Sequence, residues 1–323
     1  MADRKRVLDF RSGGWVLWVA LALSLVVSSW RVVPMLRSGD GAVGDGRTVE
    51  SYGFEVGSFT LDRSVLVAGG VPKDGIPALD NPPTMAVAEM ATFNEEHRGS
   101  FLVSEDRVIV VQVGETVRGY PIRMMNWHEL VNDTLDGRPI LVTYHPLCDS
   151  VVAYDRTVAD RILRFGHSGL LWNSNALYYD REASDGAPSL WSQLLGRAVS
   201  GPAAERGDSL AALPTLLTTY AEFASEFPEA TVLRPAEDKL RRYQRRPYDN
   251  YLRTGKLRFP VTPAADPDWR IRMQRFARMV GPGESVTVGP AEDFPTTTLL
   301  GRTDIDVRYG LQFAIVGVLG ESD

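Results

Sequence analysis

The stretch "RPILVTYHPLCDSVVAYD", residues 138–155, contains two apolar runs on either side of a short interruption. The runs at 138–144 and 149–155 are rich in Val, Ile and Tyr, which predicts two β-strands. Proline in the interruption is typical of a turn. We therefore expect two neighbouring strands here, with Cys148, the only cysteine of the chain, in the turn between them.

The rest of the chain continues this β-rich pattern. Further strand-like runs lie at 107–113, 161–169, 175–180, 189–196, 285–289 and 306–320, and helical spacing of apolar residues occurs at 84–97, 120–133 and 217–227. Because the helices do not alternate regularly with the strands, the order of elements favours an α+β fold over a βαβ fold. We expect an antiparallel-rich β domain with a few short helices, preceded by one N-terminal transmembrane helix.

Composition limits the classes of protein to consider. The chain has 323 residues, of which 44% are hydrophobic and 24% charged, as in ordinary globular proteins. A net charge of -6 argues against nucleic acid as a partner. One cysteine cannot form a disulfide within the chain, so the thiol is free, buried, metal-bound or linked to another chain.

The N-terminus indicates a membrane. A basic segment, residues 4–11, precedes an apolar run at 15–33 that only Arg31 interrupts. A helix crosses a bilayer with roughly 20 apolar residues, and basic flanks stay on the cytoplasmic side. We expect a single-pass anchor in the cell membrane, with the following domain outside the cytoplasm. A cleavable signal peptide is the alternative, and it predicts the same compartment.

These features divide the chain into three parts. Residues 1–36 would form the basic tail and the membrane anchor, or the signal peptide. Residues 37–58 are rich in Gly, Ser and charge, which predicts a flexible linker. Residues 59–323 would form the extracytoplasmic globular domain.

Four long motifs follow one another in the middle of the chain: "GYPIRMMNWHELVND" (119–133), "PILVTYHPLCDSVVAYDR" (139–156), "FGHSGLLWNSNALYYDRE" (165–182) and "SLWSQLLGRAVSGP" (189–202). In this order they resemble a prokaryotic domain-of-unknown-function family, number 3179. The resemblance implies no established activity. The family is common on secreted or membrane-anchored chains, which agrees with the N-terminus here.

The chain departs from the Cys-Pro-Leu-Cys-Gly loop of that family at two positions. His145 replaces the first cysteine, and Asp149 replaces the glycine. A dithiol–disulfide switch needs two sulfur atoms, so it is excluded for this chain alone. Histidine and cysteine are both metal ligands, however, and a separation of three residues lets them converge on one ion. We therefore expect a metal or redox site around His145 and Cys148.

Two further histidines are candidate ligands. His167 ends a predicted strand, which we expect to pair with residues 149–155 and so to approach the loop. His128 lies on the predicted short helix before the loop. Asn126, Glu129, Asn132 and Asp133, in the same segment, are candidate hydrogen-bond partners for a histidine ligand.

Copper is the first expectation for the metal. Two histidines, a cysteine and a weak thioether form the ligand set of electron-transfer copper sites, and Met124 and Met125 lie near His128 in the sequence. Thiolate and imidazole also suit zinc. Metal carriage or electron transfer would be the role.

Two other interpretations stay open. Cysteine often packs as a small buried hydrophobe, which would make the domain a non-catalytic binding or structural module. Alternatively, Cys148 with a histidine base would be the nucleophile of a thiol-dependent hydrolase or transferase. The sequence identifies neither a substrate nor a protein partner.

Overall fold

The computed structural model describes residues 43–97, 101–181, 187–280, 286–293 and 305–319. The expected tail and anchor, residues 1–36, lie outside these ranges. Within them, no helix is long and apolar enough to span a bilayer. A compact unit begins at Gly44, earlier than the expected domain start at residue 59, and Tyr52 and Phe54 are buried in its core.

The hairpin at 138–155 lies at the centre of the fold. β7 (Arg138–His145) and β8 (Ser150–Asp155) pair antiparallel, with His145 opposite Ser150. They belong to a sheet in the order β19-β18-β20-β8-β7-β6-β2, and β15 pairs with β8 beside this path. The other strands are β2 (Leu79–Asp80), β6 (Leu130–Leu135), β15 (Ala212–Leu213), β18 (Arg275–Val280), β19 (Val286–Pro290) and β20 (Asp306–Leu311).

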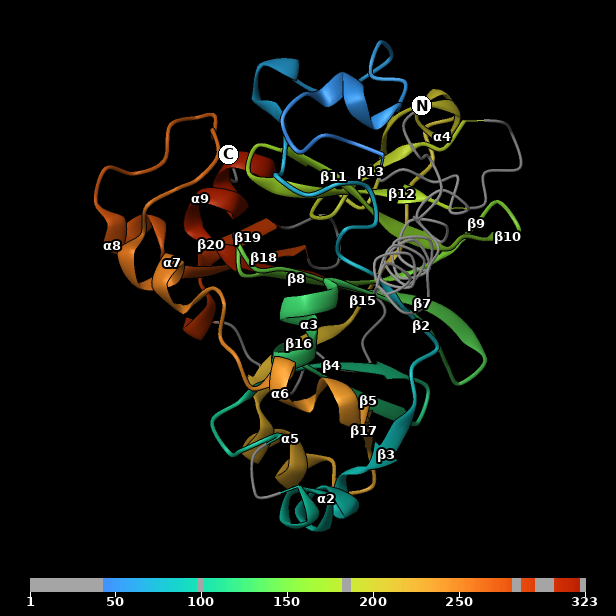
Figure 1. Cartoon of the computed structure of the whole chain (residues 1–323), viewed down its shortest axis with the longest axis vertical. Helices are drawn as coiled ribbons and strands as arrows, with labels where there is room; N and C mark the ends of the chain where they lie inside the picture. The colour runs from blue at the N-terminus through green and yellow to red at the C-terminus, as the bar shows by residue number, and fades with distance from the viewer. Residues whose placement is uncertain (1–42, 98–100, 182–186, 281–285, 294–304, 320–323) are drawn as a thin grey trace, which may run out of the picture. The chain divides into compact units, whose positions relative to one another are not determined.

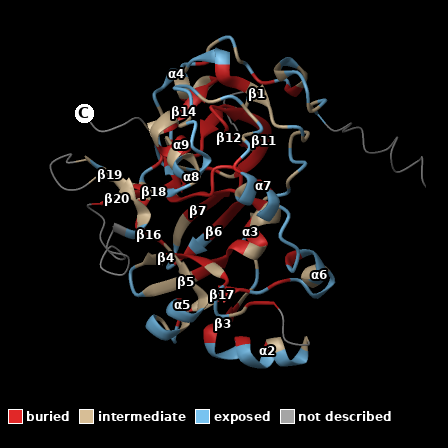
Figure 2. Cartoon of the chain, turned by 90° about the vertical axis from the view of Figure 1, so that its left-hand side faces the viewer, coloured by how far each residue is buried: buried red, intermediate tan, exposed pale blue. Residues whose placement is uncertain are grey.

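Both faces of this central sheet are buried. Alternate side chains of a strand point to opposite faces. Leu141 and Val152 accordingly lie in one hydrophobic core, and Val142 and Val151 lie in the other. The central strands therefore read as continuous apolar runs, and Figure 2 shows β6 and β7 buried while the surface helices are exposed.

A five-stranded antiparallel sheet contributes to the first core. Its order is β1 (Leu66–Ala68), β11 (Phe165–Trp172), β12 (Asn175–Asp180), β13 (Leu190–Ser192) and β14 (Ala198–Ser200). Asn173 and Ser174 connect β11 to β12, and both have positive φ, 51° and 60°. This is the conformation of a type I′ turn, which matches the twist of a tight hairpin. The turn places the Ser174 carbonyl at the candidate site.

A second five-stranded sheet contributes to the other core. Its order is β16 (Thr215–Thr219), β4 (Arg107–Val113), β5 (Thr116–Pro121), β17 (Thr231–Leu233) and β3 (Thr84–Ala86), with β17 and β5 parallel. Figure 1 shows α2 (Met90–Glu96) and α5 (Tyr220–Glu226) close to this sheet, and α3 (Ile122–His128) between it and the central sheet. β9 (Thr157–Val158) and β10 (Arg161–Ile162) form a small ribbon.

The remaining helices are short. They are α4 (Pro202–Glu205), α6 (Leu240–Tyr243), α7 (Asp249–Thr254), α8 (Trp269–Arg272) and α9 (Gln312–Ala314). Single turns occur at η1 (Val49–Tyr52), η2 (Arg63–Val65), η3 (Val87–Glu89), η4 (Glu237–Lys239), η6 (Ala291–Asp293) and η8 (Ile315–Leu319). The predicted antiparallel-rich α+β fold is therefore confirmed for the described part of the chain.

Several local predictions were wrong. Residues 84–86, 130–133 and 217–219, expected in helices, belong to strands β3, β6 and β16. β11, which carries His167, pairs with β1 and β12 and not with β8. Residues 312–319, expected to continue a strand, form α9 and η8. An apolar run of this length has no periodicity that separates a buried strand from a buried helix.

Candidate functional site

The turn after β7 holds Cys148 in the interior. Its backbone N–H donates to the His145 carbonyl at 3.2 Å, and its carbonyl accepts from Leu311 N at 2.7 Å. The thiol is 0% exposed and donates to the Ser174 carbonyl at 3.0 Å. Burial raises the pKa of Cys148, and the nearby charge of Glu129 raises it further. Cys148 is therefore a neutral thiol in this arrangement.

Asp149 anchors the other end of the turn. Its φ of 46° lies in the left-handed region, which explains why glycine suits this position. Its buried carboxylate accepts two hydrogen bonds from Arg107, at 2.8 and 2.9 Å, one from Arg275 at 2.6 Å and one from the Tyr144 hydroxyl at 2.8 Å. Burial alone would raise the pKa of Asp149, but the two guanidinium groups lower it. The carboxylate thus remains charged and holds the turn.

Glu129 stands at the C-terminal end of α3 in a strained conformation. Its φ is 56°, a region that costs a non-glycine residue about 1–3 kcal/mol. Two backbone hydrogen bonds hold it there: its N–H donates to Met125 O at 2.9 Å, and its carbonyl accepts from Tyr144 N at 2.8 Å. Only 2% of the residue is exposed. In this backbone conformation the carboxylate of Glu129 points inward, toward β7 and β11.

Two histidine side chains contact the carboxylate of Glu129. Nδ1 of His145 and Nε2 of His167 each lie 3.1 Å from the same oxygen, Oε2 of Glu129. Nε2 of His145 is also 3.2 Å from the Ser174 carbonyl. Both of these partners, the carboxylate and the carbonyl, are hydrogen-bond acceptors.

His167 makes a second hydrogen bond on the other side of its ring. Its Nδ1 accepts from Gly169 N at 3.1 Å, while its Nε2 faces Glu129. Burial alone would raise the pKa of Glu129, but the charges of His145 and His167 and their hydrogen bonds lower it to about 2. The cluster is a buried, charged His–Glu–His arrangement.

Tyr178 adds an unpaired hydroxyl beside the cluster. It faces His167 across the β11–β12 pair, with ring centroids 6.0 Å apart, and is 2% exposed. Its hydroxyl has no hydrogen-bond partner within the described residues. Burial raises the pKa of Tyr178, and the charge of Glu129 raises it further. Buried polar groups normally have a partner, so the hydroxyl leaves a place for a ligand or a water molecule.

Three of the four residues predicted as ligands lie together: His145, Cys148 and His167. The fourth, His128, makes its hydrogen bonds elsewhere. Its Nδ1 is 2.8 Å from the Pro77 carbonyl, and its Nε2 is 2.8 Å from the Tyr243 hydroxyl. Burial lowers the pKa of His128, which favours the neutral ring.

The expected thioether ligands are also separate from the thiol. Met124 and Met125 belong to the second core, whereas Cys148 belongs to the first. Among the described residues, no group of three or more His, Cys, Asp or Glu side chains is arranged as a ready metal site. In this arrangement the histidine nitrogens bind a carboxylate instead.

Glu129 was predicted only as one of four candidate hydrogen-bond partners of a histidine ligand, yet it contacts two histidines. The predicted helix covers residues 120–133 and passes through Glu129, so no helix end was expected there. In the structure α3 ends at His128, and Glu129 adopts a left-handed conformation where glycine or asparagine is usual.

Comparison with known families places these residues in context. The chain matches the family described as "Protein of unknown function (DUF3179)" over residues 73–294. It belongs to this family. Glu129, His145, Cys148 and His167 all lie inside the DUF3179 match. No curated protein and no solved structure matches the chain.

Proposed function

We propose that Glu129, His145 and His167 form a metal-binding centre, with Cys148 as an additional ligand. The observation that carries this proposal is the convergence of two imidazole nitrogens on one buried carboxylate oxygen, each at 3.1 Å. Two histidines and a carboxylate are a recurrent ligand set of zinc and non-haem iron sites. The unpaired Tyr178 hydroxyl beside the cluster supports a ligand there.

The carboxylate changes the metal we expect. Electron-transfer copper prefers two histidines and a cysteine with a distant thioether, and Met124 and Met125 lie in a different core. Zinc accepts nitrogen, oxygen and sulfur ligands in one site. We therefore propose zinc first and keep copper as the alternative.

Metal binding requires a local rearrangement. The two N–H···O bonds to Glu129 must be exchanged for bonds to the ion, because no ready cage is present among the described side chains. A histidine nitrogen that donates to Glu129 would give up that proton to bind the ion, and Cys148 would release its thiol proton if it joins. Affinity should consequently fall in acid, as is general for sites whose ligands must deprotonate.

The site would lie outside the cytoplasm. This part of the proposal rests on the basic segment and the apolar run at residues 15–33, which favour a single-pass membrane anchor.

A binding or structural module is the second candidate. It is favoured by the hydrogen bonds of the cluster, since both ring nitrogens of His145 and of His167 already have partners. The thiol-enzyme interpretation loses support. Reactive cysteines are accessible and have a lowered pKa, whereas Cys148 is buried and its pKa is raised.

Metal content of the full chain, purified without chelator and then exposed to zinc or copper, tests the proposal. We expect about one tightly bound ion per chain, lost in Glu129→Gln, His145→Ala and His167→Ala. His128→Ala is the matched control, because His128 is buried to the same extent but hydrogen-bonds elsewhere. Absence of metal in the unsubstituted protein, or equal loss in His128→Ala, would favour the structural module.

A further inference from the structure

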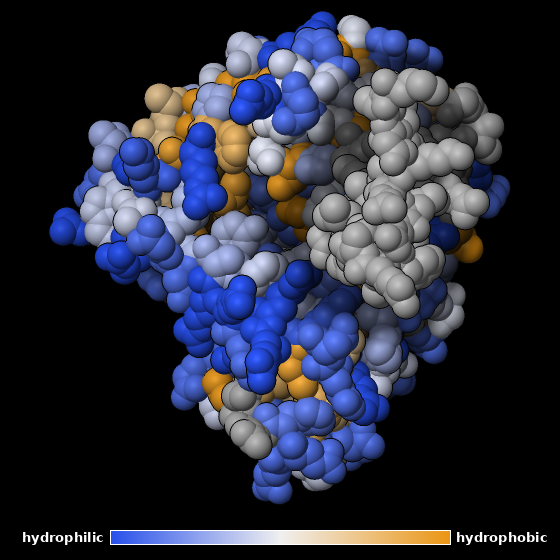
Figure 3. All heavy atoms as spheres, viewed as in Figure 1, coloured by the Kyte–Doolittle hydropathy of each residue, from blue (hydrophilic) through white to orange (hydrophobic). Residues whose placement is uncertain are grey.

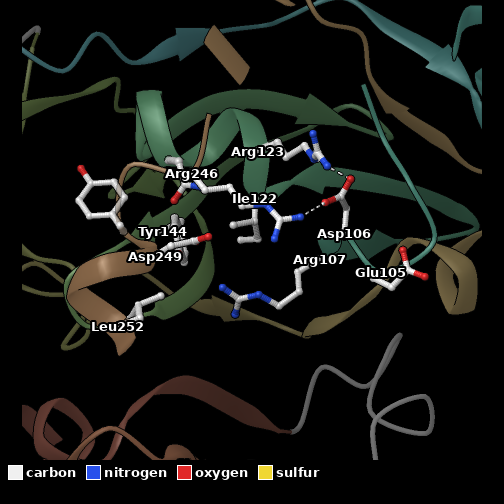
Figure 4. A pocket seen from close by; sticks show the side chains of 11 residues that line it. Glu105, Asp106, Arg107, Ile122, Arg123, Tyr144, Arg246, Asp249 and Leu252 are labelled. Carbon is white, nitrogen blue, oxygen red and sulfur yellow. Dashed lines mark ion pairs between the residues drawn. The ribbon is translucent and has the colours of Figure 1, made fainter. Parts of the chain in front are cut away.

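A second polar feature lies on the other face of β7. A cavity of about 130 Å³ is lined by residues that include Asp106, Arg107, Asn126, Tyr144 and Arg246. Adjacent residues of a strand point to opposite faces, so Tyr144 reaches this cavity while His145 reaches the His–Glu–His cluster. Figure 4 shows the side chains of Arg123 and Arg246 directed at Asp106, with Arg107 beside them. The cavity is therefore a separate site.

Two arginines share one buried carboxylate at this cavity. Asp106 is 6% exposed, lies 2.6 Å from Nε of Arg123 and lies 3.7 Å from a guanidinium nitrogen of Arg246. A single carboxylate neutralises only one of these two charges.

The same imbalance occurs at the next carboxylate. Asp149 binds Arg107, which lines the cavity, and also Arg275. Four guanidinium groups thus share two buried carboxylates. The remaining acidic residues of the lining, Glu105 and Asp249, are exposed to solvent. Three arginines and three carboxylates line the cavity, and Asp106 is the only buried carboxylate among them.

Two donors at the cavity are available for a ligand. Arg246 has 59% of its side chain exposed, and 3.7 Å is longer than a hydrogen bond, so its guanidinium is not saturated by Asp106. The Asn126 side chain has no hydrogen-bond partner in the described ranges, and it also lines the cavity. Arg246 follows α6 in a basic run, and hydrophilic side chains gather over this part of the surface (Figure 3).

We propose that this cavity binds a small oxyanion, a carboxylate or phosphate group, between Arg246, Asn126 and Arg107. The planar guanidinium fork matches two oxygens of such a group. The volume admits several water molecules, and hence a phosphate ion or a short-chain carboxylate. Neither the metal centre nor its ligands take part.

Thermal unfolding of the full, metal-free chain tests this proposal, with inorganic phosphate or acetate titrated at constant ionic strength against chloride. A ligand that binds only the folded state raises the unfolding temperature in proportion to its occupancy. We expect phosphate, acetate or both to raise it above the chloride value. The more effective of the two identifies the oxyanion.

Arg246→Gln should raise the dissociation constant about tenfold or more, because one charge-assisted contact is removed. Asn126→Ala should weaken binding to a smaller degree. Arg245→Gln is the matched control: it also removes an exposed positive charge, next to the site but outside the lining. The proposal would be overturned if chloride raised the unfolding temperature as much as phosphate and acetate do. It would also be overturned if Arg245→Gln and Arg246→Gln weakened oxyanion binding equally. This experiment uses metal-free protein, so a negative result would not bear on the proposed metal centre. A negative result in the metal-content experiment would likewise not bear on oxyanion binding.

Discussion

Glu129→Gln should separate the charge of the buried carboxylate from its shape. Gln is nearly isosteric and can still accept a hydrogen bond, but it carries no negative charge. The folded protein holds the pKa of Glu129 at about 2 instead of its ordinary 4.5. A difference of roughly 2.5 units corresponds to about 3 kcal/mol of stability for the ionised state. Removal of one partner from a buried ion pair costs a similar amount, about 3–5 kcal/mol.

The pH dependence has a definite sign. Because the pKa is lowered on folding, the contribution of Glu129 is complete above pH 4.5 and is lost as the pH falls to about 2. Glu129→Gln should therefore be about 3 kcal/mol less stable than the unsubstituted chain near pH 6. The two proteins should approach equal stability near pH 2.

Urea unfolding, followed by tryptophan fluorescence at a series of pH values, measures this difference. Trp191 is 1% exposed and reports on the core beside the cluster. Glu96→Gln, on the exposed surface of α2, controls for the general effect of removing a carboxylate. The reasoning is refuted if Glu129→Gln is as stable as the unsubstituted chain at pH 6, or if its deficit is the same at pH 6 and pH 2.5.

Three further expectations concern the thiol, the turn and the N-terminus. Cys148 should react with a maleimide on the order of a hundredfold more slowly in the native chain than in urea, because it is buried and its pKa is raised; similar rates would contradict this burial. Arg107→Gln should lower the free energy of unfolding by about 3–5 kcal/mol, whereas Arg275→Gln, whose side chain is 51% exposed, should lower it by about 1 kcal/mol or less. Chemical denaturation compares the two, and equal losses would show that Asp149 depends on both alike. Deletion of residues 1–36 should release the protein from the membrane fraction, and a reporter at the C-terminus should lie outside the cytoplasm; a cytoplasmic reporter would refute the predicted anchor.

The sequence predicted the central hairpin well because local information determines it. Two β-rich segments joined by a short Pro-containing turn can hardly form anything but an antiparallel hairpin, and the length of the turn sets the register of the pair. The two faces of the hairpin could not be assigned in the same way. Both are buried, so polar alternation, which normally identifies the core face, is absent.

The candidate site was only partly predictable. His167 reaches the cluster, but not through the pairing with β8 that we expected. It pairs with β12, and its sheet then packs on the central one, a tertiary contact without a local pattern. Glu129 depends on a left-handed residue at the end of α3, whose direction no periodicity reveals. Asp149 was noticed as a departure from glycine, yet its partner Arg275 is more than a hundred residues away.

X-ray absorption spectroscopy of the zinc-loaded protein tests the central claim most directly. Our account predicts scattering from two imidazoles at about 2.0–2.1 Å and from a carboxylate oxygen, with a sulfur at about 2.3 Å if Cys148 joins. His145→Ala and His167→Ala should each remove imidazole scattering, whereas His128→Ala should leave the spectrum unchanged. A shell of oxygen atoms only, or a spectrum that the His145 and His167 substitutions do not alter, would contradict a metal centre at this cluster.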